Sequence, residues 1–297
     1  MTIFISCLLY GFLWLLALLP LRVLYLFSDF LFISIYYLFP YRKKLVLENL
    51  KQAFLEKDLH EINSISKRYY KHFADSVLES FYMIHMSLNE NSLRYRYKNL
   101  SLLEELFNQG KSVVLLMPHY GNWEWLAGLD QKSPLHFLAV YKPLSNKCFN
   151  KLFIRIRERF GGETIPMRKV LRKIIESNQK DELNITLFLY DQRPVPGEIN
   201  YWVKFLNQDT PVILGAEKIA KRFNQPVVFL KTKRIKRGYY ENEFIELYRD
   251  PAATDEHEIT DKYYSLLEEM IKEEPEYWLW SHNRWKFNTP EELISQN

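Results

Sequence analysis

The sequence predicts an α/β fold, in which a central, mostly parallel β-sheet is flanked by helices and preceded by one or more hydrophobic N-terminal membrane helices. Two observations support this prediction. Short apolar runs typical of buried strands alternate with segments of helical periodicity, and the first part of the chain is almost free of charge. No repeat, low-complexity tract or linker divides the rest. The simplest organisation is an anchor over residues 1–44 and one domain over residues 45–297.

The N-terminal segment is long enough to act as a membrane helix. Residues 3–21 carry no charge, and a second apolar run over residues 23–39 is interrupted mainly by Asp29. A helix needs about 20 apolar residues to cross a bilayer. A signal peptide is disfavoured, because no positive n-region and no A-x-A cleavage site are present. Spanning helices and a pair lying in the interface both remain open, and the basic residues 42–44 favour a cytoplasmic location for the domain on their C-terminal side.

The remaining chain alternates helices and strands. Residues 45–110 show mainly helical spacing, and Gly110 is suited to end a helix. Further strands and helices come after it in alternation, which is typical of a parallel sheet. The predicted strands cover residues 112–117, 135–140, 185–190, 226–230 and 243–248, and the predicted helices cover residues 147–160, 168–178, 212–223 and 258–273.

Composition excludes several classes of protein. Hydrophobic residues make up 47% and aromatic residues 16%, which suits a large core or a lipid interface, whereas a net charge of +4 is too small to indicate nucleic-acid binding. Cys7 and Cys148 give neither a disulfide framework nor a metal motif. Without H-x3-H or C-x2-C spacing a zinc site is disfavoured, and the chemistry considered below needs no metal or cofactor.

One segment combines the features of a catalytic loop. His119 follows the buried strand after a proline, Gly121 permits a sharp turn, and Asn122 is a good N-cap for the next helix. His119 would then lie at the carboxyl end of a strand, where open α/β sheets bind their ligands. We expect Glu124, in the first turn of that helix, to bring its carboxylate to one imidazole nitrogen.

A histidine–carboxylate pair suits acyl transfer. An alcohol or amine must lose a proton as it attacks a thioester, and histidine can take that proton because its ordinary pKa lies near neutrality. A carboxylate on the other ring nitrogen fixes the tautomer and stabilises the imidazolium. H-x4-E alone is a weak signal, since most histidines are surface or core residues. The strand–proline–histidine–glycine context singles out His119.

Residues 118–124 resemble the H-x4-[DE] motif of glycerolipid acyltransferases, and they are most similar to the bacterial lipid A biosynthesis (Kdo2-lipid A) lauroyl/myristoyl acyltransferase family. Residues 157–162 match its arginine-rich stretch before a glycine, residues 190–194 resemble its Asp-Gln segment, and residues 275–286 are similar to its P-E-Q-Y-L-W-x-H-R-R-F-K signature. Asn283 replaces the first arginine of that signature, and Lys-Phe-Leu-Asn stands where the family usually has Phe-Phe-Gly. These departures leave the acceptor open.

The resemblance implies roles for several residues. His119 would be the general base and Glu124 its orienting partner, in a glycerolipid acyltransferase-like catalytic domain over residues 45–297. Arg157 and Arg159 would meet anionic groups of the substrate, for which guanidinium groups are well suited. Alternatively, these arginines lie on a solvated helix face.

Further candidates lie later in the chain. Asp191 and Gln192 follow a predicted strand and so face the same crevice, unless Asp191 only caps a turn. Arg284 is expected to bind substrate, whereas Trp278 and the neighbouring tryptophans are expected to be core residues. The basic run 231–237 has five cations in seven positions, which are either solvated or contact anionic headgroups or an acyl carrier protein.

The resemblance implies an acyltransferase that moves a fatty acyl chain from acyl-acyl carrier protein to a hydroxyl of a lipid A precursor. It would act at the cytoplasmic face of the bacterial inner membrane. A lysophospholipid or aminolipid acyltransferase with the same residue pair is the alternative. A hydrolase would need a nucleophile such as the serine of G-x-S-x-G, which does not occur here. A non-enzymatic membrane scaffold would tolerate His119→Ala.

Overall fold

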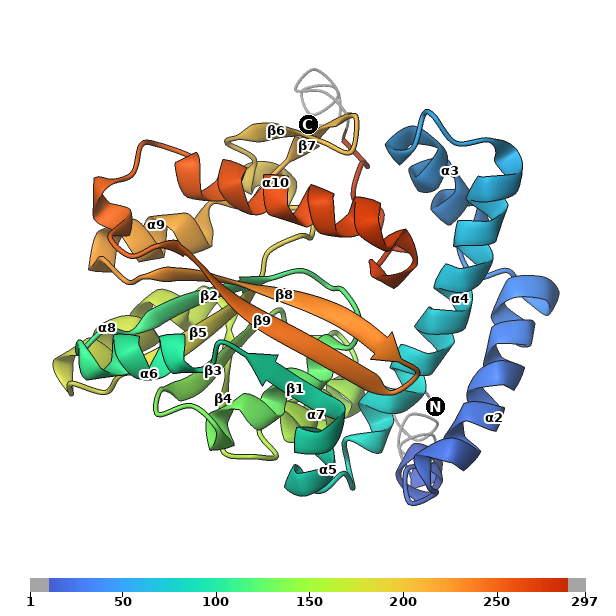
Figure 1. Cartoon of the computed structure of the whole chain (residues 1–297), viewed down its shortest axis with the longest axis horizontal. Helices are drawn as coiled ribbons and strands as arrows, with labels where there is room; N and C mark the ends of the chain where they lie inside the picture. The colour runs from blue at the N-terminus through green and yellow to red at the C-terminus, as the bar shows by residue number, and fades with distance from the viewer. Residues whose placement is uncertain (1–10, 288–297) are drawn as a thin grey trace.

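The computed structural model describes residues 11–287 and contains one seven-stranded sheet (Figure 1). The strand order is β1-β9-β8-β2-β5-β3-β4, and all neighbouring pairs are parallel except the β8–β9 hairpin. The predicted α/β fold with a mostly parallel sheet is therefore confirmed. The strands are β1 (Tyr95–Lys98), β2 (Val113–Met117), β3 (His136–Tyr141), β4 (Glu163–Pro166), β5 (Asn184–Leu189), β8 (Val227–Lys236) and β9 (Tyr239–Tyr248), and a separate hairpin holds β6 (Trp202–Phe205) and β7 (Gln208–Pro211).

The five strands predicted from the sequence correspond to β2, β3, β5, β8 and β9. The outer strands β1 and β4 were not predicted, because each has only four residues and a mixed burial pattern. Strand β8 continues through Lys236, so most of the basic run 231–237 lies in a strand.

The helical prediction for residues 45–110 is correct in part. This region divides into α3 (Lys43–Ala53), α4 (Leu59–Tyr82), α5 (Leu88–Arg94) and α6 (Ser101–Asn108), with β1 between the last two. Helix α4 begins at a capping box, in which Asp58 and Glu61 each accept from the other's backbone N–H. The four later helices are confirmed: α7 (Lys147–Arg157), α8 (Val170–Gln179), α9 (Gly215–Phe223) and α10 (Glu258–Glu273).

Helices cover both faces of the sheet, as the burial of β2 requires. All five residues of β2 are buried, and successive side chains join different cores. Val114 and Leu116 pack in the core that includes α9 and α10, whereas Leu115 and Met117 pack in the core that includes α6 and α7. A strand covered on both faces can expose only its ends, which places any site at an edge of the sheet.

The apolar N-terminal region forms helices along one side of the molecule. Residues 11–16 are helical, and α2 (Leu21–Ile33) follows Pro20 and continues into the π-helical turn η1 (Ser34–Leu38). The predicted run 3–21 begins outside the described residues. Among the described residues, Leu21–Leu38 is the helical stretch that is long and apolar enough to cross a membrane. Helix α2 packs beside α4 (Figure 1).

Candidate active site

The neighbouring strands β2 and β5 bring His119 and Asp191 together. Their parallel register pairs Met117 with Leu189, and the Tyr190 N–H donates to the Met117 carbonyl (3.1 Å) just beyond the sheet. His119 and Asp191 each lie two residues past a member of the Met117–Leu189 pair. The register therefore places these two side chains opposite each other at the carboxyl edge, as the prediction of a shared crevice requires.

Asp191 is the carboxylate that holds the imidazole. The Nδ1 atom of His119 lies 2.6 Å from Oδ1, while Oδ2 accepts the backbone N–H of His119 (3.0 Å) and the indole N–H of Trp278 (2.8 Å). The Asp191 side chain is only 2% exposed. Burial alone would raise the pKa of Asp191, but the attraction of His119 and the three donors together hold this pKa below its ordinary value. Asp191 is therefore an ionised, fully hydrogen-bonded partner for the histidine.

The expected contact between Glu124 and His119 is wrong. The Glu124 carboxylate instead forms a two-point ion pair with Arg157, at 2.8 Å from Nε and 2.6 Å from Nη2. The segment after Asn122 is the 3-10 helix η2 (Trp123–Gln131), and the Glu124 carboxylate lies against α7, which carries Arg157. Trp123 directly precedes Glu124, and its indole lies edge-on to the imidazole of His119 (centroids 5.0 Å apart).

The other imidazole nitrogen faces Gln192. Its side-chain nitrogen lies 3.1 Å from Nε2 of His119. With Nδ1–H donating to Asp191, Nε2 is an acceptor and the Gln192 amide donates to it. The His119 side chain is 12% exposed, so the imidazole is mostly covered. Gln192 thus occupies the position that the hydroxyl of an acceptor would need.

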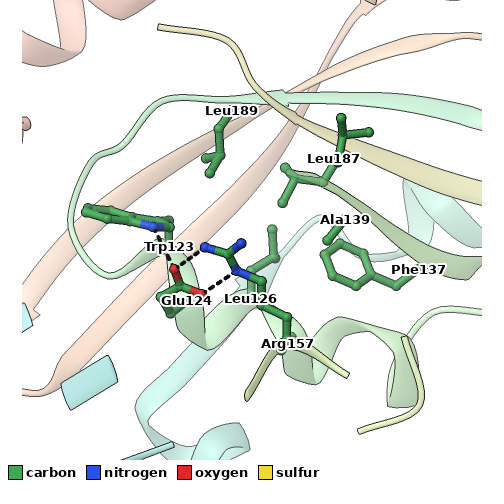
Figure 2. A pocket seen from close by; sticks show the side chains of 10 residues that line it. Trp123, Glu124, Leu126, Phe137, Ala139, Arg157, Leu187 and Leu189 are labelled. Atoms are coloured by element: carbon green, nitrogen blue, oxygen red, sulfur yellow. Dashed lines mark hydrogen bonds and ion pairs between the residues drawn. The ribbon is translucent and has the colours of Figure 1, made fainter. Parts of the chain in front are cut away.

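A narrow apolar pocket opens beside Glu124 and Arg157 (Figure 2). Figure 2 shows the Arg157 guanidinium held by Glu124 and facing a wall that includes Leu187 and Leu189. The free space is about 20 Å³, enough for one water molecule but not for a fatty chain. An acyl chain can therefore enter only when lining side chains move. The lining residues are Trp123, Glu124, Leu126, Ala127, Phe137, Ala139, Val140, Arg157, Leu187 and Leu189.

Buried groups of α4 support the loop that carries His119. The Glu79 carboxylate accepts from the Asn122 amide (2.8 Å) and from the hydroxyls of Tyr25 (2.7 Å) and Tyr240 (2.7 Å). His72 contacts the Gly121 carbonyl through Nε2 (3.3 Å). Gly121 has a φ of +61°, a conformation that suits glycine. Neither Glu79 nor His72 was predicted, because a polar residue in an amphipathic helix gives no sign of what it faces.

The C-terminal signature holds the same loop from the other side. Leu279 N–H donates to the His119 carbonyl (3.1 Å), and Gly121 N–H donates to the Tyr277 carbonyl (3.0 Å). Trp278 was expected to be a core residue. It is buried, but its indole N–H also donates directly to the Asp191 carboxylate.

The remaining predicted arginines lie differently from Arg157. Arg159 donates to the backbone carbonyls of Ile84 (2.5 Å) and Met86 (3.1 Å), beyond the end of α4. Arg284 is completely buried, and its Nη2 donates to the Tyr264 hydroxyl (3.0 Å). The Tyr264 hydroxyl in turn donates to the carbonyl of Tyr190, the residue before Asp191.

The signature also contributes His282, to which the sequence had suggested no role. Burial is the main reason that the pKa of His282 falls to about 4; Asp191 opposes this shift, and Arg284 and His119 add to it. His282 is therefore a neutral neighbour of the charged groups at the site.

The basic run 231–237 is not simply solvated. Arg234 Nη2 lies 2.8 Å from Asp75, and Arg237 Nη2 lies 2.6 Å from Asp75 and 2.7 Å from Asp29. Asp75 is buried on α4, so these two arginines neutralise an internal carboxylate.

A comparison with protein families gives a match over nearly the whole chain. The family model described as bacterial lipid A biosynthesis acyltransferase matches residues 1–287, which include every site residue described above. No curated protein matches the chain. The match agrees with the resemblance carried by the four sequence motifs.

Proposed function

The chain belongs to the bacterial lipid A biosynthesis acyltransferase family, and we propose that it transfers a fatty acyl group from acyl-acyl carrier protein to a hydroxyl of a lipid A precursor. Membership makes the protein an acyltransferase with a lipid acceptor. The donor, the hydroxyl and the residue roles are our proposal. The observation that carries it is the 2.6 Å contact between His119 and the buried Asp191 at the carboxyl edge of the sheet, next to an apolar pocket.

His119 acts as the general base. The acceptor hydroxyl displaces the Gln192 amide from Nε2, and its oxygen attacks the thioester carbonyl carbon while its proton passes to Nε2. Asp191 keeps the Nδ1 proton in place and stabilises the imidazolium. The tetrahedral intermediate then collapses, the carbon–sulfur bond breaks, and the departing thiolate takes the proton from Nε2. The products are the ester and a free thiol, and His119 returns to its starting state.

Arg157 supplies positive charge for the oxyanion. Glu124 engages Nε and Nη2, so Nη1 remains available for the oxygen that becomes negative in the intermediate. Glu124 is then a positioning residue that fixes the guanidinium plane, since a two-point ion pair leaves little rotational freedom. The carboxylates of Asp191 and Glu124 thereby support the base and the oxyanion donor separately.

The other candidates support this centre indirectly. Arg284, through Tyr264 and the Tyr190 carbonyl, holds the backbone that presents Asp191. We assign Arg159 a structural role, because its guanidinium donates to the backbone carbonyls that come after α4. The fatty chain lies in the apolar pocket after its lining side chains have moved apart.

The catalytic domain, residues 45–297, lies at the cytoplasmic face of the inner membrane, and residues 1–44 anchor it. The apolar stretch Leu21–Leu38 and the basic residues 42–44 support this placement. Acyl carrier protein is a cytoplasmic donor, so the active site and the donor meet on the same side.

Acyl transfer by the purified protein tests the proposal. Lauroyl or myristoyl thioesters of acyl carrier protein and of CoA are offered with a lipid A precursor or with a lysophospholipid, and mass spectrometry identifies the acylated product. We expect a lipid A ester formed faster from the carrier-protein donor, and loss of the product in His119→Ala. Acylation of the lysophospholipid alone would overturn the assigned acceptor. Full activity of His119→Ala would overturn the mechanism.

A further inference from the structure

The N-terminal helices present one continuous apolar surface. Among the described residues, most of the large apolar side chains that are exposed lie between residues 12 and 41. On α2 they follow helical spacing along a single face, and Figure 1 shows the helix itself at the outer edge of the molecule beside α4. Exposed apolar surfaces of this extent mark an interaction surface. The side chains on this face of α2 are Val23, Leu26, Phe27, Phe30 and Ile33.

The opposite face of α2 is buried, and polar contacts bind it to the rest of the protein. The Tyr25 hydroxyl donates to Glu79 (2.7 Å), the Ser28 hydroxyl donates to Asp75 (2.6 Å), and Asp29 pairs with Arg237 (2.7 Å). Arg237 also binds Asp75, so one guanidinium joins α2, α4 and the β8–β9 hairpin. Helix α2 is therefore held firmly against the catalytic domain.

Helices α2 and α4 run antiparallel in contact over most of α2. Tyr25 contacts Glu79 near one end, Ser28 contacts Asp75 farther along, and the ring of Tyr36 in η1 lies 5.5 Å from that of Tyr70. As the residue number rises on α2 and η1, it falls on α4. Any depth that α2 reaches in a bilayer is therefore shared by residues 70–79 of α4.

This shared depth argues against a crossing orientation. If Leu21–Leu38 crossed the bilayer in this arrangement, the exposed Lys71 of α4 would also lie at hydrocarbon depth. Charged side chains at that depth are strongly disfavoured. We infer that α2 and η1 lie in the plane of the membrane, as a surface helix whose outer apolar face enters the boundary between headgroups and acyl chains.

Cations near both ends of this helix fit an anionic lipid surface. Arg22 and Lys236 are exposed near its N-terminal end, where Gly238 approaches Tyr25. At the other end the Lys43 ammonium lies 3.7 Å from the centre of the Tyr36 ring. A flat orientation places all of these cations at headgroup level, where each is attracted by anionic lipid.

Spin-label depth measurements distinguish the two orientations. Single cysteines replace the outward residues Leu26, Phe30 and Leu38 in a protein carrying Cys7→Ser and Cys148→Ser, and each variant is bound to vesicles of phosphatidylethanolamine and phosphatidylglycerol. The relative access of oxygen and a water-soluble nickel chelate reports the depth of each label. All three native side chains are exposed, so the substitutions remove no core packing. Glu48→Cys on the exposed side of α3 is the matched control in water.

A flat helix predicts the same shallow depth for all three positions. A crossing Leu21–Leu38 helix has its midpoint near residue 30, so at a rise of about 1.5 Å per residue it predicts a depth gradient in which label 30 lies deepest and label 38 lies roughly 12 Å closer to a membrane surface. Such a gradient would overturn the inference, and so would labels that all remain in water. The inference rests on the membrane placement in the proposed function. The depths are measured without donor or acceptor, and acyl transfer is assayed separately in the same vesicles. A failure of the flat orientation can therefore be distinguished from a failure of the proposed acyl transfer.

Discussion

Replacing Asp191 with asparagine tests which carboxylate orients the histidine. In the native site Oδ2 accepts two N–H groups, from the His119 backbone and from Trp278, while Oδ1 faces Nδ1 at 2.6 Å. An asparagine keeps both of those donors satisfied only if its single oxygen takes the Oδ2 position. Its NH2 group then points at Nδ1 and donates to it. The ring proton is thereby moved to Nε2, which can no longer accept a proton from the substrate.

The expected loss follows from that tautomer. Where a buried aspartate sets the histidine tautomer of a serine protease, its replacement by asparagine lowers kcat about 10⁴-fold. We expect Asp191→Asn to lower kcat by about 10³- to 10⁴-fold, which corresponds to roughly 4–5.5 kcal/mol of activation free energy. Because the substrate is bound by other groups, KM should change little.

The molecule offers a matched control. Asp130 contacts Nδ1 of His136 (3.0 Å) and also accepts a backbone N–H, but this pair lies elsewhere and the histidine side chain is 44% exposed. Asp130→Asn should leave kcat unchanged when initial rates of lipid A acylation are measured. If Asp191→Asn stayed within tenfold of wild type while Glu124→Gln lost a thousandfold, our assignment of the two carboxylates would be refuted.

Four further predictions concern the groups around this pair. Arg157→Lys keeps the charge but loses the two-point contact with Glu124, so kcat should fall about 10- to 100-fold at similar thermal stability, and an unchanged kcat would exclude Arg157 from oxyanion binding. Ala139→Phe fills the apolar pocket, and mass spectrometry should show shorter acyl chains in the product, whereas an unaltered chain length would place the chain elsewhere. Glu79→Gln weakens the support of the catalytic loop and should lower kcat roughly tenfold with KM unchanged, in contrast to a purely structural residue, whose loss would lower Tm alone. Burial lowers the pKa of His282 to about 4, so between about pH 6.5 and 4 the unfolded chain binds a proton that the folded protein does not. The free energy of unfolding therefore decreases as the pH falls through that window, and His282→Gln should make the accompanying fall in Tm shallower.

Much of the fold could be predicted because its signals are local. The apolar run of β2, the proline after it and the glycine turn are all contained in about ten residues, and they correctly placed His119 at the carboxyl edge of the sheet. The short outer strand β1 escaped prediction for the opposite reason. Its four residues pair only with β9 in the sheet, and β9 lies more than 140 residues away along the chain.

The partner of the histidine could not be derived from local spacing. Glu124 is near His119 in sequence, but a 3-10 helix has a different rise and turn from an α-helix, and an ion pair with α7 holds its carboxylate. Asp191 lies 72 residues away and reaches His119 because β2 and β5 are neighbours, although β3 and β4 intervene in the chain. Strand order is a property of the whole sheet, which periodicity does not encode. The prediction that both residues end parallel strands was correct, and only the order of those strands was missing.

The observed arrangement gives a physical reason for the spacing of the H-x4-E motif. His119 must stay within hydrogen-bonding distance of Asp191 at the end of β5, while Glu124 must reach Arg157 at the end of α7. The five-residue step between them therefore spans two fixed points that belong to different elements. Adding or removing one residue would release either the proposed base or the proposed oxyanion donor, even with both side chains still present. The motif thus spans the distance from the end of β2 to the end of α7, and the carboxylate that contacts the imidazole comes from the end of the neighbouring strand β5.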